Sequence, residues 1–83
     1  MKILYFAWLR QKTGIDSEDV DVPAEVGDVA GLLDWLKHRN ANFAEALSDF
    51  ESVRVAVNQE FAELDSPVAA GDEVAIFPPM TGG

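Results

Sequence analysis

Residues 28–36 read Asp-Val-Ala-Gly-Leu-Leu-Asp-Trp-Leu, and this stretch decides how the rest of the chain folds. Asp28 stands where an N-cap residue belongs, directly before the first large apolar residue. The large apolar residues recur at i, i+3, i+4 and i+7, which places them on one face of a helix. They are Val29, Leu32, Leu33 and Leu36. We therefore predict an amphipathic helix that follows Asp28 and ends near Asn40.

Two strands are expected before this helix. Residues 2–9 form an apolar run that is too short to span a bilayer, and we predict that they form the first strand. A turn is expected at residues 11–14. Residues 18–22 then alternate between acidic side chains and valine until Pro23 ends the pattern. Together these segments predict a β-hairpin that opens the fold.

The chain after the helix predicts a short second helical segment and further strands. The helical segment is indicated by an apolar repeat at Phe43, Ala46, Leu47 and Phe50. Residues 53–57 and 60–63 are expected to be strands joined by a tight turn at Asn58-Gln59. Residues 73–77 are expected to form the last strand, which Pro78-Pro79 closes.

A hairpin, a crossover helix and further strands imply an α+β fold. The sheet is mixed, and one main helix packs on one of its faces because right-handed crossover places it there. This is the β-grasp, or ubiquitin-like, architecture. We expect one domain over residues 1–77 and an extended C-terminal tail over residues 78–83.

Composition excludes several classes of function. Fifteen acidic and six basic residues give a net charge of -9, which disfavours nucleic acid and membrane surfaces as partners and favours a basic protein surface. The absence of cysteine excludes disulfides, thiolate metal sites and cysteine nucleophiles. We expect a cytoplasmic protein with no bound metal or cofactor.

Strand periodicity leaves an apolar group on the face of the sheet away from the helix. Ile3, Tyr5, Ala7 and Leu9 of the first predicted strand are expected to point toward the helix. The residues expected on the other face are Leu4, Phe6, Trp8, Phe61 and Phe77. Exposed aromatic clusters usually mark an interface. The alternative is a register shift at a bulge, or isolated exposed apolar residues.

The tail carries the candidate reactive group. Pro78 and Pro79 are expected to hold the start of the tail extended. The residues that follow them are Met80, Thr81, Gly82 and Gly83. Glycine lacks a β-carbon, so the backbone at Gly82-Gly83 can approach another protein closely. The Gly83 α-carboxylate becomes a good electrophile once adenylation by ATP gives it a leaving group, and a persulfide can then convert it into a thiocarboxylate. No internal thiol is present to intercept the activated carbonyl.

The chain resembles the small subunit of molybdopterin synthase, the MoaD-type sulfur carrier. The resemblance spans the whole length and is carried by these segments: Tyr5-Phe6-Ala7, Arg10, Val57-Asn58-Gln59, residues 70–75 and the final run from Phe77 to Gly83. The final run is the most specific of them. Gln11-Lys12 departs from the family pattern, in which an acidic residue is expected after Arg10.

The resemblance implies a function and partners. A thiocarboxylated Gly83 would enter the active site of a larger catalytic subunit in a heterotetrameric synthase and donate sulfur to cyclic pyranopterin monophosphate, forming the dithiolene of molybdopterin. An E1-like adenylyltransferase would use ATP to activate Gly83, and a desulfurase or rhodanese-like protein would supply sulfur. Phe6, Phe61 and Phe77 map onto the family's hydrophobic contact positions. The chain itself would be a sulfur-donor subunit without catalytic side chains.

Other interpretations remain. The acidic run Asp16, Glu18, Asp19 and Asp21 lacks the spacing of a calcium loop and is typical of a solvated hairpin. His38 lies late in the helix, where a cation is favourable, and has no nucleophile paired with it in the sequence. Trp35 is expected to be half-buried packing. A sulfur carrier for the thiazole of thiamine or another acceptor, a ubiquitin-like protein modifier, and a plain binding module are the alternative functions.

Overall fold

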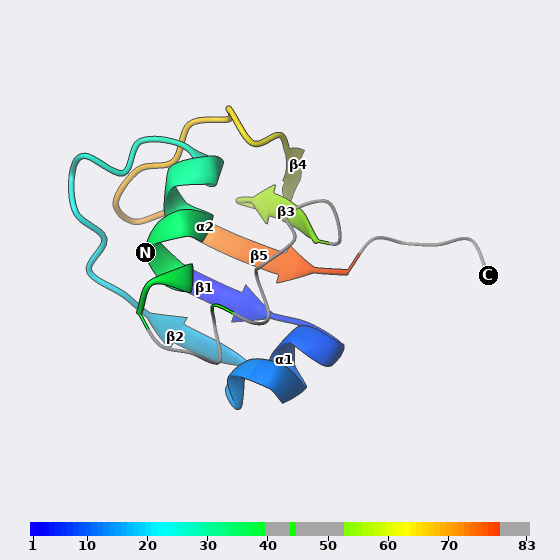
Figure 1. Cartoon of the computed structure of the whole chain (residues 1–83). Coiled ribbons are helices and arrows are strands. Elements are labelled where there is room, and N and C mark those ends of the chain that lie inside the picture. The colour runs from blue at the N-terminus through cyan, green and yellow to red at the C-terminus, as the bar shows by residue number, and fades with distance from the viewer. Residues whose placement is uncertain (40–43, 45–52, 79–83) are drawn as a thin grey trace.

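The structure is a computed structural model that describes residues 1–39, 44 and 53–78 (Figure 1). Its helices are α1 (Trp8–Thr13) and α2 (Val29–Lys37). Its strands are β1 (Lys2–Tyr5), β2 (Ser17–Asp19), β3 (Arg54–Val57), β4 (Glu60–Ala62) and β5 (Glu73–Phe77). Within this described part, no helix is long and apolar enough to cross a membrane.

The described strands form one mixed five-stranded sheet in the order β2-β1-β5-β3-β4. β5 lies in the centre, parallel to β1 and antiparallel to β3, and the two outer pairs are antiparallel hairpins. Helix α2 crosses one face of this sheet (Figure 1). The predicted α+β, β-grasp architecture is confirmed.

Helix α2 begins as its sequence predicts. The Asp28 carboxylate accepts a 2.8 Å hydrogen bond from the Gly31 N–H and so satisfies a donor of the first turn. The helix ends at Lys37, before the predicted end near Asn40, because the Arg39 N–H donates to Leu36 O in a tighter turn. The second helical segment predicted over residues 43–50 lies outside the described residues, apart from Ala44.

The core lies between α2 and the sheet. The apolar face of α2 packs against the inward side chains of β1, β3 and β5, which removes apolar surface from water and supplies the main stabilisation of a domain this small. The fully or almost fully buried side chains from these elements are Ile3, Tyr5, Val29, Leu32, Leu33, Leu36, Val55, Val74 and Ile76.

The prediction of one strand over residues 2–9 is wrong. β1 ends at Tyr5. Ala7 adopts φ 56° and ψ -133°, whereas strand residues have a negative φ of about -120° to -140°. The Leu9 N–H donates to Phe6 O at 3.2 Å, closing a turn from which α1 starts. Leu9 is buried as predicted, although it lies on a helix, whereas Ala7 is exposed and not directed to the core.

The opening hairpin is also shorter than predicted. The turn expected at residues 11–14 is the end of α1, where Gly14 takes a left-handed conformation (φ 82°) and donates to Arg10 O. β2 covers Ser17–Asp19 only, and just beyond it the Val20 N–H still donates to Met1 O, next to the start of β1.

The second hairpin follows the prediction closely. Asn58 and Gln59 have φ values of 51° and 70°, as a two-residue hairpin turn requires. β4 ends at Ala62, one residue before the predicted end, because the Glu63 N–H donates to Ser66 Oγ instead of continuing the ladder.

Candidate docking face and tail exit

The face of the sheet away from α2 carries a continuous apolar row. Strand register places Leu4 beside Ala75, Ala75 beside Ala56, and Ala56 beside Phe61. Directly opposite residues share one face of a sheet, so this row crosses β1, β5, β3 and β4. We call this surface, together with Phe6, Phe77 and Pro78, the outer face.

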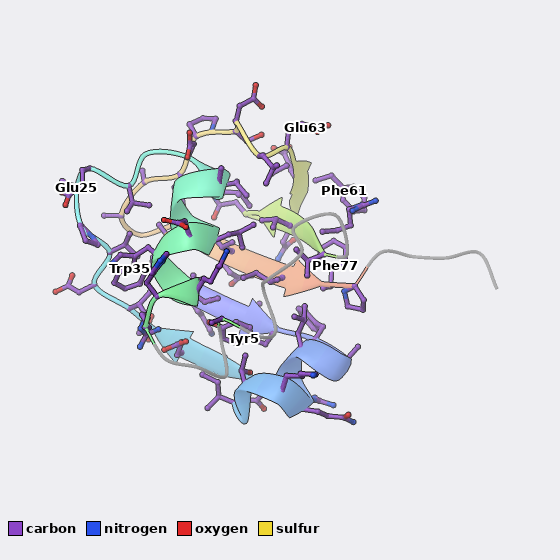
Figure 2. The ribbon with its side chains drawn as sticks, in the orientation of Figure 1. Tyr5, Glu25, Trp35, Phe61, Glu63 and Phe77 are labelled. Carbon is purple, nitrogen blue, oxygen red and sulfur yellow. The ribbon has the colours of Figure 1, made fainter. Side chains whose placement is uncertain are left out.

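The phenylalanines of the outer face are accessible as the alternation predicts. Phe61 is 83% exposed and Phe6 is 46% exposed, while Phe77 is half-buried. The Phe61 and Phe77 ring centroids lie 5.9 Å apart with their planes tilted by 59°, and the two side chains project from the same end of the molecule (Figure 2). Leu4 is half-buried, and the Trp8 side chain lies outside what the structure describes.

A shallow hollow of about 420 Å³ adjoins the aromatic pair. It is lined by Phe6, Ala7, Ala75, Phe77 and Pro78. None of these residues carries a charge, although the chain as a whole has a net charge of -9. The hollow therefore suits an apolar side chain and offers nothing to an ion.

The tail leaves the sheet beside this hollow. β5 is held by β1 on one side and β3 on the other, so the position of Pro78 is set by two ladders. The Phe6 N–H extends the first ladder by donating to Ile76 O at 3.1 Å. The predicted tail residues Pro79, Met80, Thr81, Gly82 and Gly83 lie outside the described residues.

Comparison with known proteins identifies the family. The ThiS family model matches residues 3–83. The chain belongs to the ThiS family. The molybdopterin synthase sulfur carrier subunit of Escherichia coli is 39% identical over 83 residues, covering 100% of this chain and 99% of that protein. Small archaeal modifier protein 1 of Haloferax volcanii is 39% identical over 69 residues, covering 78% of this chain and 77% of that protein.

Solved structures agree with this assignment. A putative molybdopterin converting factor subunit 1 from Pyrococcus furiosus superposes with a TM-score of 0.76 at 34% identity, and the match covers 95% of each chain. The resemblance to the molybdopterin synthase small subunit that the sequence predicted is thus confirmed. The roles of Phe6, Phe61, Phe77 and the tail stay predictions.

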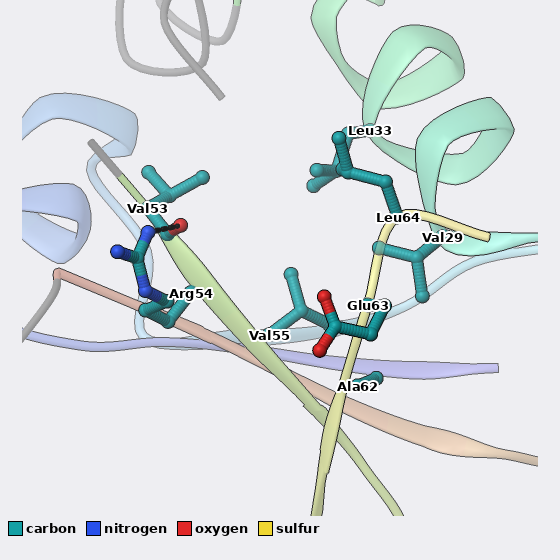
Figure 3. Close-up of a pocket in the computed structure, with 8 residues that line it drawn as sticks. All are labelled: Val29, Leu33, Val53, Arg54, Val55, Ala62, Glu63 and Leu64. Atoms are coloured by element: carbon teal, nitrogen blue, oxygen red, sulfur yellow. Dashed lines mark hydrogen bonds between the residues drawn. The ribbon is translucent and has the colours of Figure 1, made fainter. Parts of the chain in front are cut away.

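This ThiS family chain has a second hollow, of about 340 Å³, between α2 and the β3–β4 hairpin (Figure 3). It is lined mainly by aliphatic side chains, and Arg54 and Glu63 are its charged lining residues (Figure 3). The Arg54 Nη1 donates to Val53 O at 3.0 Å. No nucleophile lies beside a base among these lining residues, so the hollow has no hydrolytic or acyl-transfer arrangement.

The remaining sequence candidates form no site. His38 is exposed at the end of α2, with Nδ1 2.7 Å from Asp34 O and 3.7 Å from Asp34 Oδ1. The described residues contain no cluster of three or more acidic or histidine side chains suited to a metal ion. Trp35 is half-buried against the core, as expected.

Sequence reasoning missed two features. Glu18, taken as a solvated acid, joins Tyr5 to Arg39 through hydrogen bonds of 2.8 Å each. Ala7 carries a positive φ beside the hollow. The pairing of Glu18 with Arg39 spans 21 residues and has no local signal, whereas Gly14 after the basic residues Arg10 and Lys12 could have indicated the end of a helix at α1.

Proposed function

We propose that this ThiS family protein is the sulfur carrier subunit of a cytoplasmic molybdopterin synthase and that the α-carboxylate of Gly83 carries the sulfur. One structural observation supports this most directly: Pro78 leaves the central strand at the edge of the apolar outer face. A protein that covers Phe61 and Phe77 therefore also receives the residues that follow Pro78. The curated relatives named as sulfur carrier subunits support the same role.

The chemistry starts with activation of Gly83. In this proposal the carboxylate oxygen attacks the α-phosphate of ATP on an E1-like adenylyltransferase and pyrophosphate leaves, which turns a poor electrophile into a good one, the acyl adenylate. A persulfide of the sulfur donor attacks the carbonyl carbon and AMP leaves. A thiol then reduces the acyl disulfide to the thiocarboxylate. Because the chain contains no cysteine, no side chain of its own competes for the activated carbonyl.

Delivery is the second half of the proposal. The outer face docks on the large subunit of the synthase, and the tail carries the thiocarboxylate into its active site. There each thiocarboxylate passes one sulfur atom to cyclic pyranopterin monophosphate, and two such transfers complete the dithiolene of molybdopterin. Docking through a preformed aromatic surface requires little ordering of the folded domain, which favours repeated binding and release.

Charge steers the encounter. The net charge of -9 creates a negative field around the apolar face and favours partners whose surface around the cleft is basic. Exposed charges are screened by salt, so the association rate with the large subunit should fall as ionic strength rises, while the apolar contact is largely retained.

Mass spectrometry tests the central claim. The protein is incubated with ATP, the adenylyltransferase and a sulfur donor, and the C-terminal peptide is then sequenced by fragmentation. We expect an exchange of oxygen for sulfur located at Gly83. The proposal fails if the protein is adenylated at another position or gains no sulfur under conditions that charge a known carrier.

Two related functions are distinguished by further assays. Delivery of sulfur to the thiazole of thiamine would give product with the thiazole-forming enzymes and none with the large synthase subunit and pterin precursor. A role as a protein modifier is favoured by the match to small archaeal modifier protein 1. That role would yield lysine conjugates of the chain in cell lysates, which a dedicated carrier does not form.

A further inference from the structure

Ala7 occupies a backbone conformation that an alanine adopts only under strain. Its φ of 56° and ψ of -133° are close to the first central position of a type II′ turn, which glycine normally fills. The turn is closed by a 3.2 Å hydrogen bond that the Leu9 N–H donates to Phe6 O. A β-carbon at this position crowds the adjacent backbone, and such residues persist where the surroundings or a function retain them.

The turn itself is needed for the fold, but the Ala7 methyl group is not. The turn directs Leu9 into the core, where it is 0% exposed, and leaves Phe6 on the outer face. Ala7 is exposed and contributes no buried surface to the core. Glycine would make the same turn with less strain, so folding alone does not explain alanine at this position.

The methyl group lies where the proposed partner docks. Ala7 lines the apolar hollow together with Phe6, Ala75, Phe77 and Pro78, beside the tail exit. The hollow is continuous with the exposed Phe61 through the half-buried Phe77, and the centroids of these two rings lie 5.9 Å apart. A strained residue that presents an apolar group at the margin of an exposed apolar hollow is typical of a binding surface.

We propose that Ala7 is a contact residue, whose methyl group and rigid turn hold the wall of a hollow that receives an apolar side chain of the synthase large subunit. This inference rests on the proposed function. The apolar lining selects the chemistry of the occupant, because a charged or hydrogen-bonding group would lose its water there without gaining a partner.

Two glycine variants test the role of Ala7. Ala7→Gly removes the methyl group and relieves the strain. Gln59→Gly is the matched control, because Gln59 also has a positive φ, of 70°, but lies in the β3–β4 turn outside the hollow. Thermal unfolding and the Kd for the large subunit of molybdopterin synthase from the same genome are measured for each full-length protein.

We expect opposite effects on stability and binding in Ala7→Gly. Relief of strain, partly offset by the greater freedom of glycine in the unfolded chain, should raise the Tm by about 4–8 °C. Loss of one methyl contact and of the rigid wall should raise the Kd about 4- to 10-fold. Gln59→Gly should show a smaller rise in Tm and a Kd within about twofold of the wild type, given the usual spread of surface substitutions.

Other values of the Kd or the Tm would overturn the proposed role of Ala7. A Kd for Ala7→Gly equal to that of the wild type, or an equal rise in Kd for both variants, overturns the contact role of Ala7. An unchanged or lower Tm for Ala7→Gly overturns the strain on which the inference depends. If the wild-type protein does not bind the large subunit at all, the proposed function itself is wrong and this inference falls with it.

Discussion

Tyr5 donates a 2.8 Å hydrogen bond from its hydroxyl to Glu18 Oε2, although the tyrosine is only 1% exposed. Glu18 Oε1 also accepts from Arg39 Nη1 at 2.8 Å, and the Arg39 guanidinium lies 5.3 Å from the centroid of the Trp35 ring. One carboxylate thus ties β1 and β2 to the end of α2. This connection closes the core on the side of the β2 edge of the sheet.

Tyr5→Phe should lower the free energy of unfolding. The substitution leaves Glu18 without its buried donor, and a hydrogen bond to a charged group contributes about 1.5–3 kcal/mol. Urea denaturation measures the loss. Binding to the large subunit serves as the control and should not change, because Tyr5 points into the core and away from the outer face. A variant as stable as the wild type would show that Glu18 finds another donor of equal strength.

The buried hydrogen bond between Tyr5 and Glu18 also predicts how the free energy of unfolding changes at high pH. Burial, followed by the hydrogen bond to Glu18, raises the pKa of Tyr5 above its ordinary value of 10.0. A group with a raised folded-state pKa stabilises the fold fully below the unfolded value and loses that contribution as pH rises beyond it. The stability difference between wild type and Tyr5→Phe should therefore be constant up to about pH 9 and shrink above about pH 10. A difference that stays constant through this range contradicts the prediction.

Asn58 controls the titration of Asp72. The Asn58 Nδ2 donates to Asp72 Oδ1 at 3.1 Å and the Ala69 N–H donates to Oδ2 at 2.9 Å, and these bonds lower the pKa of Asp72. Asn58→Gly keeps a residue suited to φ 51° but removes the amide. The pKa of Asp72 should then rise toward its ordinary value, as measured by NMR titration of its carboxyl carbon.

The lowered pKa of Asp72 makes the folded protein sensitive to acid. A depressed folded-state pKa stabilises the fold above the unfolded pKa, and the contribution is lost as pH falls through the folded value. The wild type should therefore lose more stability than Asn58→Gly as the pH falls below about 4. Equal acid sensitivity of the two proteins would mean that the Asn58 amide does not set the Asp72 pKa.

Phe61→Ala should separate binding from folding. Phe61 is 83% exposed, so its truncation should change the free energy of unfolding by about 1 kcal/mol or less, whereas loss of a central aromatic contact should weaken binding to the large subunit more than about tenfold. Leu64→Ala is the matched control: Leu64 is 47% exposed but lies outside the outer face. Calorimetric titration that finds equal weakening in both variants would count against the outer face as the docking surface.

Any residue added after Gly83 should abolish sulfur transfer. An added residue replaces the free α-carboxylate with an amide, which the adenylyltransferase cannot activate. Thermal unfolding and binding to the large subunit should remain within error of the wild type, because the outer face is unchanged. Transfer activity that survives a permanent C-terminal extension would show that sulfur is carried elsewhere.

The sequence predicted α2 and the order of the later strands well, because Val29, Leu32, Leu33 and Leu36 follow one clear period and Asn58-Gln59 marks a turn. It failed at residues 6–13. The apolar run continues past Tyr5 without interruption, and the positive φ of Ala7 that ends β1 contradicts the preference of alanine itself. Tertiary packing of Leu9 overrides the local pattern there.

The candidate site was predictable in part. Alternation identified Phe6 and Phe61 as exposed, and the structure confirms that exposure. The hollow was not predictable, since it depends on the unexpected turn at Ala7, which lines it together with the end of β5. The link from Tyr5 through Glu18 to Arg39 joins residues distant in sequence, which periodicity cannot reveal.

The parallel pairing of β1 with β5 has a mechanical consequence. Lys2 lies beside Glu73 and Tyr5 beside Ile76, so the first strand and the strand that leads to Pro78 run in the same direction. Tension between the amino end of β1 and the tail therefore acts along both strands in opposite directions, and it loads all their mutual hydrogen bonds at once in shear. If the proposed function holds, a partner that binds the residues after Pro78 would load this ladder as a whole and not one bond at a time.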